Sequence, residues 1–156
     1  MTNGQPDLLK GLLQHEVDQV LSLGSRIKLP SGAELFPLGA QADSLFLIER
    51  GRITLTLPLH VRGQDEDILV EERSPGETVG WSALIPPHRF TLKATAPLET
   101  DVIALSRDAL REHFSGHPAV GHAVALNLAA VIGQRLQLFQ AMWVREMQRM
   151  VELRCA

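Results

Sequence analysis

The residues whose types and spacing could bind a ligand lie between positions 74 and 91, in the stretch SPGETVGWSALIPPHRFT. Gly76 and Gly80 permit a positive φ and let the backbone approach a ligand closely. The residues at 82–84 can begin a short helical turn whose N–H groups face an anion, and Arg89 adds a cation nearby. The pattern predicts a phosphate-binding turn, and a β-turn with a capping turn and no ligand is the alternative.

Histidines supply a second set of candidate ligands. His113, His117 and His122 recur at separations of four and five residues, and three imidazoles can bind zinc. Gly116 interrupts any helical face that they would share, and structural zinc sites show tighter spacing. We therefore predict surface and capping roles for these histidines, and no metal site.

Catalytic constellations are missing from the sequence. A metal-dependent enzyme on a β-barrel needs histidines and a carboxylate that converge inside the barrel, but only His60 and His88 fall in the β-rich region. There is no Gly-x-Ser-x-Gly elbow, no Walker-type loop and no Cys-x-x-Cys pair. The acidic stretch at 63–67 is predicted to be a solvated hairpin tip. We predict that the protein is not an enzyme and holds no cofactor, with a cupin-like metal enzyme as the distant alternative.

Length and composition indicate one globular domain with its own core. The chain has 156 residues, of which 45% are hydrophobic, and a formal net charge of -3. This slight acidic excess lacks the basic bias of a nucleic-acid binder, so no direct DNA binding is expected. The single cysteine, Cys155, fits a reducing compartment. The start resembles no secretory leader, and the apolar runs are shorter than the ~18 residues that span a bilayer. We predict a cytoplasmic protein without a membrane span.

Hydrophobic spacing and turn residues indicate the elements that must position these side chains. Residues 7–22 have helical spacing with Asp7 as the N-cap, and Gly11 is a point where that helix can split. From 25 to 106, short β-rich runs alternate with turns, and residues 52–57 alternate strictly between polar and apolar. Such an arrangement is typical of a sandwich or a small barrel. The predicted strands are 26–29, 44–48, 52–59, 68–73, 92–96 and 100–105.

The last third of the chain is predicted to be helical. Ser106 can cap a short helix through His113, and Pro118 then takes the first position of a second helix that reaches about Arg154. At ~1.5 Å per residue this helix is about 55 Å long, more than a domain of this size can cover. Its distal half exposes an apolar row, which predicts a homodimer seam, with packing on another protein as the alternative. The row consists of Leu136, Phe139, Trp143, Met147 and Met150.

Several segments share the pattern of a known family. They are LFPLG at 35–39, ADSLFLIERGRI at 42–53, the glycine motif at 75–84, APLETDVIAL at 96–105 and the short helix at 108–114. Together they resemble a cyclic nucleotide-binding domain, the sensor module of the catabolite activator and related regulators. The resemblance implies a mainly β fold with flanking helices. An eight-stranded jelly-roll barrel (double-stranded β-helix) with N-terminal helices would occupy 1–117, and a long dimerisation helix 118–156.

The chain departs from this family at its two charged ligand contacts. In the family a glutamate follows the second glycine and binds the ribose 2′-hydroxyl, and an arginine further on pairs with the cyclic phosphate. Here Trp81 takes the glutamate position, Phe90 takes the arginine position, and Arg89 lies one residue early, on the opposite face of a strand. Losing these contacts costs roughly two decades of affinity or more. An altered or empty pocket is favoured, and a cyclic nucleotide held through Arg89 and backbone N–H groups is the alternative.

The resulting hypothesis is a stand-alone, dimeric sensor or regulatory module that couples pocket occupancy to the packing of its C-terminal helices. The resemblance makes cAMP or cGMP the implied ligand class. Without a helix-turn-helix domain after the long helix, a separate protein partner would receive the signal. A scaffold that has lost ligand binding and docks a partner through the exposed helix is the alternative. The candidate ligand-binding residues are Gly76, Gly80, Trp81, Ser82, Ala83, Leu84, Arg89, Phe90, Thr91, Asn127 and Arg135.

Overall fold

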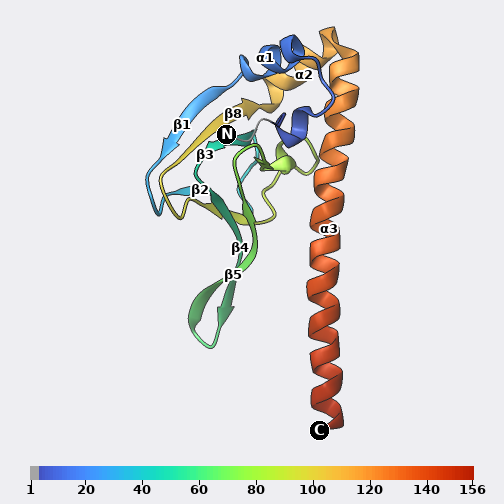
Figure 1. Cartoon of the computed structure of the whole chain (residues 1–156). Coiled ribbons are helices and arrows are strands. Elements are labelled where there is room, and N and C mark those ends of the chain that lie inside the picture. Colours follow the sequence, from blue (N-terminus) through green and yellow to red (C-terminus); the bar gives the residue numbers. More distant parts are fainter. Residues whose placement is uncertain (1–3) are drawn as a thin grey trace.

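Two four-stranded antiparallel sheets form the β-barrel of the chain (Figure 1). The computed structural model describes residues 4–156, so the first three residues of the predicted 1–117 unit lie outside it. One sheet has the strand order β1-β8-β3-β6 and the other β2-β7-β4-β5. The predicted mainly β fold of eight strands with flanking helices is confirmed. The strands are β1 (Ser25–Leu29), β2 (Glu34–Phe36), β3 (Ser44–Arg50), β4 (Ile53–Val61), β5 (Gln64–Arg73), β6 (Thr78–Val79), β7 (Lys93–Thr95) and β8 (Thr100–Ser106).

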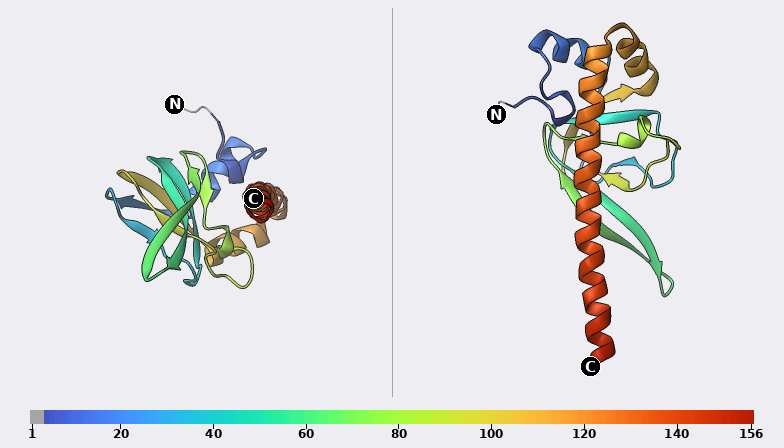
Figure 2. Two further views of the ribbon diagram at one scale, coloured as in Figure 1. Left: turned by 90° about the horizontal axis from the view of Figure 1, so that it is seen from below. Right: turned by 90° about the vertical axis from the view of Figure 1, so that its right-hand side faces the viewer.

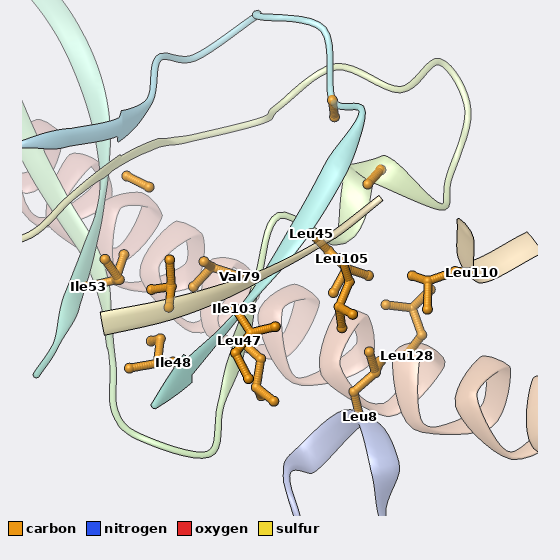
Figure 3. Close-up of a cluster of buried hydrophobic side chains, with 14 of the residues drawn as sticks. Leu8, Leu45, Leu47, Ile48, Ile53, Val79, Ile103, Leu105, Leu110 and Leu128 are labelled. Atoms are coloured by element: carbon orange, nitrogen blue, oxygen red, sulfur yellow. The ribbon is translucent and has the colours of Figure 1, made fainter. Parts of the chain in front are cut away.

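Apolar side chains from both sheets and from the helices fill one continuous core (Figure 3). On β3 and β8 the antiparallel register places Leu45 opposite Leu105, and both are fully buried. The strict alternation predicted for β4 fails where its register against β5 shifts between Leu55 and Thr56. The extra residue there is Val70 on β5, which pairs with no residue of β4, and Leu55 and Thr56 are both buried.

The turn of the β4–β5 hairpin is shorter than the sequence predicts. Arg62 and Gly63 lie between the two strands, with φ values of 53° and 78°. Positive φ at both central residues is the geometry of a type I′ turn, whose twist matches that of the flanking strands. The predicted tip at 63–67 is exposed throughout, but its extent is wrong, since only Gly63 lies in the turn and the acidic residues 65–67 belong to β5.

The predicted N-terminal helix forms as two shorter pieces, η1 (Asp7–Leu9) and α1 (Gln14–Leu21). Gly11 lies between them with a φ of 84°, a conformation that favours glycine and ends the first piece. The predicted capping role of Asp7 is wrong. Its carboxylate instead accepts hydrogen bonds from the N–H and the hydroxyl of Thr78, because the chain folds this segment against β6.

Two helices, α2 (Arg107–Gly116) and α3 (Pro118–Cys155), complete the chain. The hydroxyl of Ser106 caps α2 by accepting from the N–H of Ala109, as predicted. Pro118 begins α3, also as predicted. Figure 2 shows α3 running along one side of the barrel and continuing well beyond it. Its buried side chains all lie in the first half, and they are Val120, Val124, Leu128, Val131 and Arg135.

Part of α3 is long and apolar enough to cross a membrane by length and composition. An 18-residue window of this helix reaches a mean hydropathy of 1.2, and 28% of the window is buried within the fold. The prediction of no membrane span counted uninterrupted apolar runs, whereas the window average tolerates isolated polar residues. A helix that packs one face on a β-domain passes the same test, so composition alone does not assign α3 to a membrane.

Candidate ligand pocket

The glycine-rich stretch forms a tight turn that leads into a single helical turn. Gly80 has a φ of 82°, and the 3₁₀ turn η2 (Trp81–Ala83) follows it directly. The short turn predicted at 82–84 therefore begins one residue earlier. A Cβ atom on Gly80 would lie 3.1 Å from the ring of Phe90 and 3.4 Å from that of Phe46. Glycine is required here by the left-handed backbone and by the close approach of aromatic rings.

Aromatic rings occupy the space inside this turn. The rings of Phe36 and Phe90 stack with centroids 3.7 Å apart and planes inclined by 10°, and Phe46 lies 5.9 Å from Phe36. Phe90 is only 7% exposed. The void that remains measures about 10 Å³, against roughly 300 Å³ or more for a small-molecule site. It is lined by Phe36, Leu55, Gly80, Trp81, Ser82, Phe90, Thr91, Leu92 and Arg135.

Arg89 lies outside this aromatic interior. Its side chain is exposed, and its Nη1 donates to the carbonyl oxygen of Gly39 at 3.0 Å. Its backbone pairs with Gln41 in an isolated bridge. Arg89 is not among the residues that line the void, whereas its neighbours Phe90 and Thr91 are. The structure thus brings the aromatic candidates together and leaves this cation on the surface.

The two polar candidates on α3 have different surroundings. Asn127 donates from Nδ2 to the carbonyl oxygens of Leu8 and Lys10, at 2.9 and 3.0 Å, so it holds the N-terminal segment against α3. Arg135 lies beside the void, where its Nε donates to Glu71 at 2.7 Å. Burial lowers the pKa of Arg135, and the nearby carboxylate of Glu71 offsets part of that shift.

A cluster of charges next to the void has no counterpart among the sequence predictions. Arg73, which is 4% exposed, forms ion pairs with Asp7 at 2.8 Å, Glu71 at 3.0 Å and Glu77 at 2.8 Å. The second oxygen of Glu71 accepts from Arg135. Glu71 and Glu77 are near Arg73 in the chain, but no local spacing signal could have revealed the pair with Asp7, which is 66 residues away.

An apolar groove of about 310 Å³ opens on the proximal half of α3. Further along the helix, the predicted dimerisation residues Leu136 and Trp143 are 68% and 63% exposed. Met150 is also exposed, while Phe139 and Met147 are half-buried. The groove is lined by Leu84, Ile85, Phe114, Gly121, Val124, Ala125, Leu128, Ala129 and Ile132.

The histidines form no metal-binding group in the part of the chain that the structure describes. His113 and His117 stack with ring centroids 4.3 Å apart, and Nδ1 of His117 contacts the carbonyl oxygen of His113 at 3.0 Å. Burial lowers the pKa of His113, and the adjacent His117 lowers it further. His122 is exposed on α3. These contacts place two of the rings at the junction between α2 and α3.

Comparison with known proteins relates this architecture to one family. The family described as cyclic nucleotide-binding domain matches residues 26–117. The Cyclic AMP receptor protein of Thermus thermophilus is 31% identical over 134 residues, which are 86% of this chain but only 58% of that protein. The structure of the Thermus thermophilus catabolite activator protein matches with a TM-score of 0.73 and 29% identity, over 91% of this chain and 62% of that one. A cyclic nucleotide-binding domain from Methylobacillus flagellatus shares the fold, with a TM-score of 0.67 and 24% identity over 94% of this chain and 79% of its own.

Proposed function

The chain belongs to the cyclic nucleotide-binding domain family, and from that premise we propose that it is a dimeric regulatory module whose pocket is closed by its own side chains. The observation that carries this proposal is the stack of Phe36 on Phe90, which leaves a void of about 10 Å³ where a ligand would lie. A nucleotide would have to displace a buried aromatic pair before it could bind. We therefore propose that the module works without cAMP or cGMP.

The charges around the void support the same conclusion. Trp81 offers no carboxylate to a ribose hydroxyl, and Phe90 offers no cation to a phosphate. The one charged residue among those that line the void is Arg135, and its Nε already donates to Glu71. Hydrogen bonds to charged groups are worth about 1.5 to 3 kcal/mol each, so their loss removes most of the affinity for a cyclic nucleotide.

The output of the module is carried by α3. Ile132 lines the groove on the proximal half of α3, and Leu136, four residues later, begins the exposed row. The groove and the row therefore form one apolar strip along the helix. A second copy of α3 is the simplest cover for such a strip, because closed symmetric dimers are the commonest assemblies. In this view residues 1–117 are the barrel unit and 118–156 the interaction helix of a non-enzymatic, cytoplasmic protein. A separate protein that docks on the same strip is the second candidate, favoured by the exposure of Trp143.

Calorimetric titration with cAMP and with cGMP tests the closed pocket. The wild-type chain is expected to give no saturable heat with either nucleotide, because the void is far too small for the ligand. The variant Arg89→Ala is the matched control, since Arg89 is exposed and bonded to Gly39 rather than facing the void. Micromolar binding by the wild type that disappears in Arg89→Ala would contradict the proposal and establish a nucleotide held through that arginine.

A further inference from the structure

Five charged side chains, of which the two arginines are buried, form one cluster between the barrel and α3. Arg73 on β5 pairs with Asp7, Glu71 and Glu77 at 2.8 to 3.0 Å. Glu71 uses its other oxygen to accept from Arg135 on α3, at 2.7 Å. The two arginines are 4% and 7% exposed and the side chains of the three carboxylates 17% to 36%, so the pairs are partly shielded from water and stronger than fully exposed ones.

This cluster joins η1 and α3 to the neighbouring strands β5 and β6. Asp7 lies in η1, and its carboxylate also binds the N–H and hydroxyl of Thr78 in β6, just before the turn at Gly80. Glu71 lies in β5, and Arg135 lies at the far end of the buried half of α3. Arg135 is the last fully buried residue of α3 among those described, and beyond it the partly buried Leu138 and Phe139 still pack against the core.

The balance of charges indicates that the cluster is an internal link rather than a receptor for a further anion. Three carboxylates, Asp7, Glu71 and Glu77, face two guanidinium groups, Arg73 and Arg135, which leaves the cluster with one net negative charge. An incoming phosphate would meet this excess and would compete with Glu71 for Arg135. Arg135 is thus already compensated from within the chain.

We propose that Glu71 and Arg135 form a clamp that fixes α3 against the barrel in the absence of any ligand, so that the distal half of the helix is presented in one orientation. The clamp rests on the proposed function, in which the closed pocket leaves no nucleotide to set the helix. A buried pair suits this role because removing one partner leaves an uncompensated interior charge, which is strongly unfavourable. The position of α3 is therefore constitutive.

Substituting Glu71 and substituting Arg135 leave different charges without a partner. Glu71→Gln deprives Arg135 of its only hydrogen-bonding carboxylate among the described residues. Arg135→Met keeps an unbranched side chain in place, and Glu71 still pairs with Arg73. Glu71→Gln should therefore release α3 more than Arg135→Met, and the double variant, which buries no unpaired charge at this point, should release it less than Glu71→Gln alone.

Hydrogen exchange and a spin-label distance measure the release. In Glu71→Gln, amides of α3 from 128 to 138 are expected to exchange about tenfold faster or more, because a buried pair holds that segment. Nitroxides at Glu99→Cys and Gln140→Cys, in a Cys155→Ser background, report the barrel-to-helix distance, whose distribution should broaden. Glu49→Gln is the matched control, since it breaks a 2.9 Å pair with Arg26 that does not involve α3.

Unchanged exchange and an unchanged distance in folded Glu71→Gln and Arg135→Met would overturn the clamp. If Glu71→Gln fails to fold, the double variant Glu71→Gln/Arg135→Met is measured in its place. A distance distribution broader than that of the wild type supports the clamp, and an unchanged distribution overturns it. A broad distance in the wild type would overturn the clamp while leaving the closed pocket intact. Nucleotide binding that does not alter a narrow wild-type distance would overturn the closed pocket and leave the clamp standing.

Discussion

The double substitution Trp81→Glu and Phe90→Arg is expected to give this chain measurable affinity for cAMP. Replacing Phe90 removes one ring of the stack with Phe36 and opens the interior of the turn. The new arginine supplies a cation for the cyclic phosphate, and the new glutamate an acceptor for the ribose hydroxyl. At about 1.5 to 3 kcal/mol for a hydrogen bond to a charged group, affinity should exceed that of a control without the arginine by about tenfold to a hundredfold.

The control for this gain is Trp81→Glu combined with Phe90→Met, which opens the same space without a cation. Loss of the buried, stacked Phe90 ring should lower the free energy of unfolding by about 1 to 3 kcal/mol, so both double variants are expected to melt earlier than the wild type. Added cAMP should raise the melting temperature of the arginine variant alone. A folded arginine variant that stays silent in calorimetry would show that the pocket lacks more than these two side chains.

The substitution Trp143→Glu is expected to dissociate the proposed dimer. Trp143 is 63% exposed and lies in the middle of the distal apolar row, where a second α3 would cover it. A charge at a central tryptophan should raise the dissociation constant about thirtyfold or more, the effect of a typical interface hot spot. Sedimentation equilibrium of the wild type and the variant over a range of concentrations measures this change.

Ala141→Glu is the matched control for the dimer, because it introduces the same charge about half a helical turn away, on the opposite face of α3. This control should sediment as a dimer. A monomeric wild type would contradict the dimer and favour a separate protein partner on the same strip. Cys155 is exposed at the end of α3 and reports how the two α3 helices of the dimer are oriented. Only parallel helices place the two Cys155 thiols close enough to cross-link.

Much of the fold could be predicted because its signals are local. The Ser106 cap, the break before Pro118 and the turn near Ser82 each depend on a few neighbouring residues, and each is present in the structure. The failures are also local in origin. The bulge at Val70 on β5 has no distinct residue signature, and Arg62 adopts a positive φ that the sequence gives no reason to expect.

The candidate site could be predicted only in part, because its key contacts join distant residues. The positions of Trp81 and Phe90 indicated an altered pocket, but nothing in the sequence paired Phe90 with Phe36 on β2. The contacts of Glu71 with Arg135 span 64 residues, and strand or helix periodicity carries no information about them. Tertiary packing alone brought these two charged residues from separate elements into one partly buried pair.

The central claim, that the closed pocket leaves α3 independent of nucleotide, is tested most directly by hydrogen exchange of the wild-type chain with and without saturating cAMP. The amides to follow are those of η2, Trp81–Ala83, and those of α3 from 118 to 138. The predicted result is that both segments exchange at the same rates in the two samples. Protection of η2 together with a changed exchange pattern in α3 on adding cAMP would contradict the claim and show a nucleotide-coupled helix.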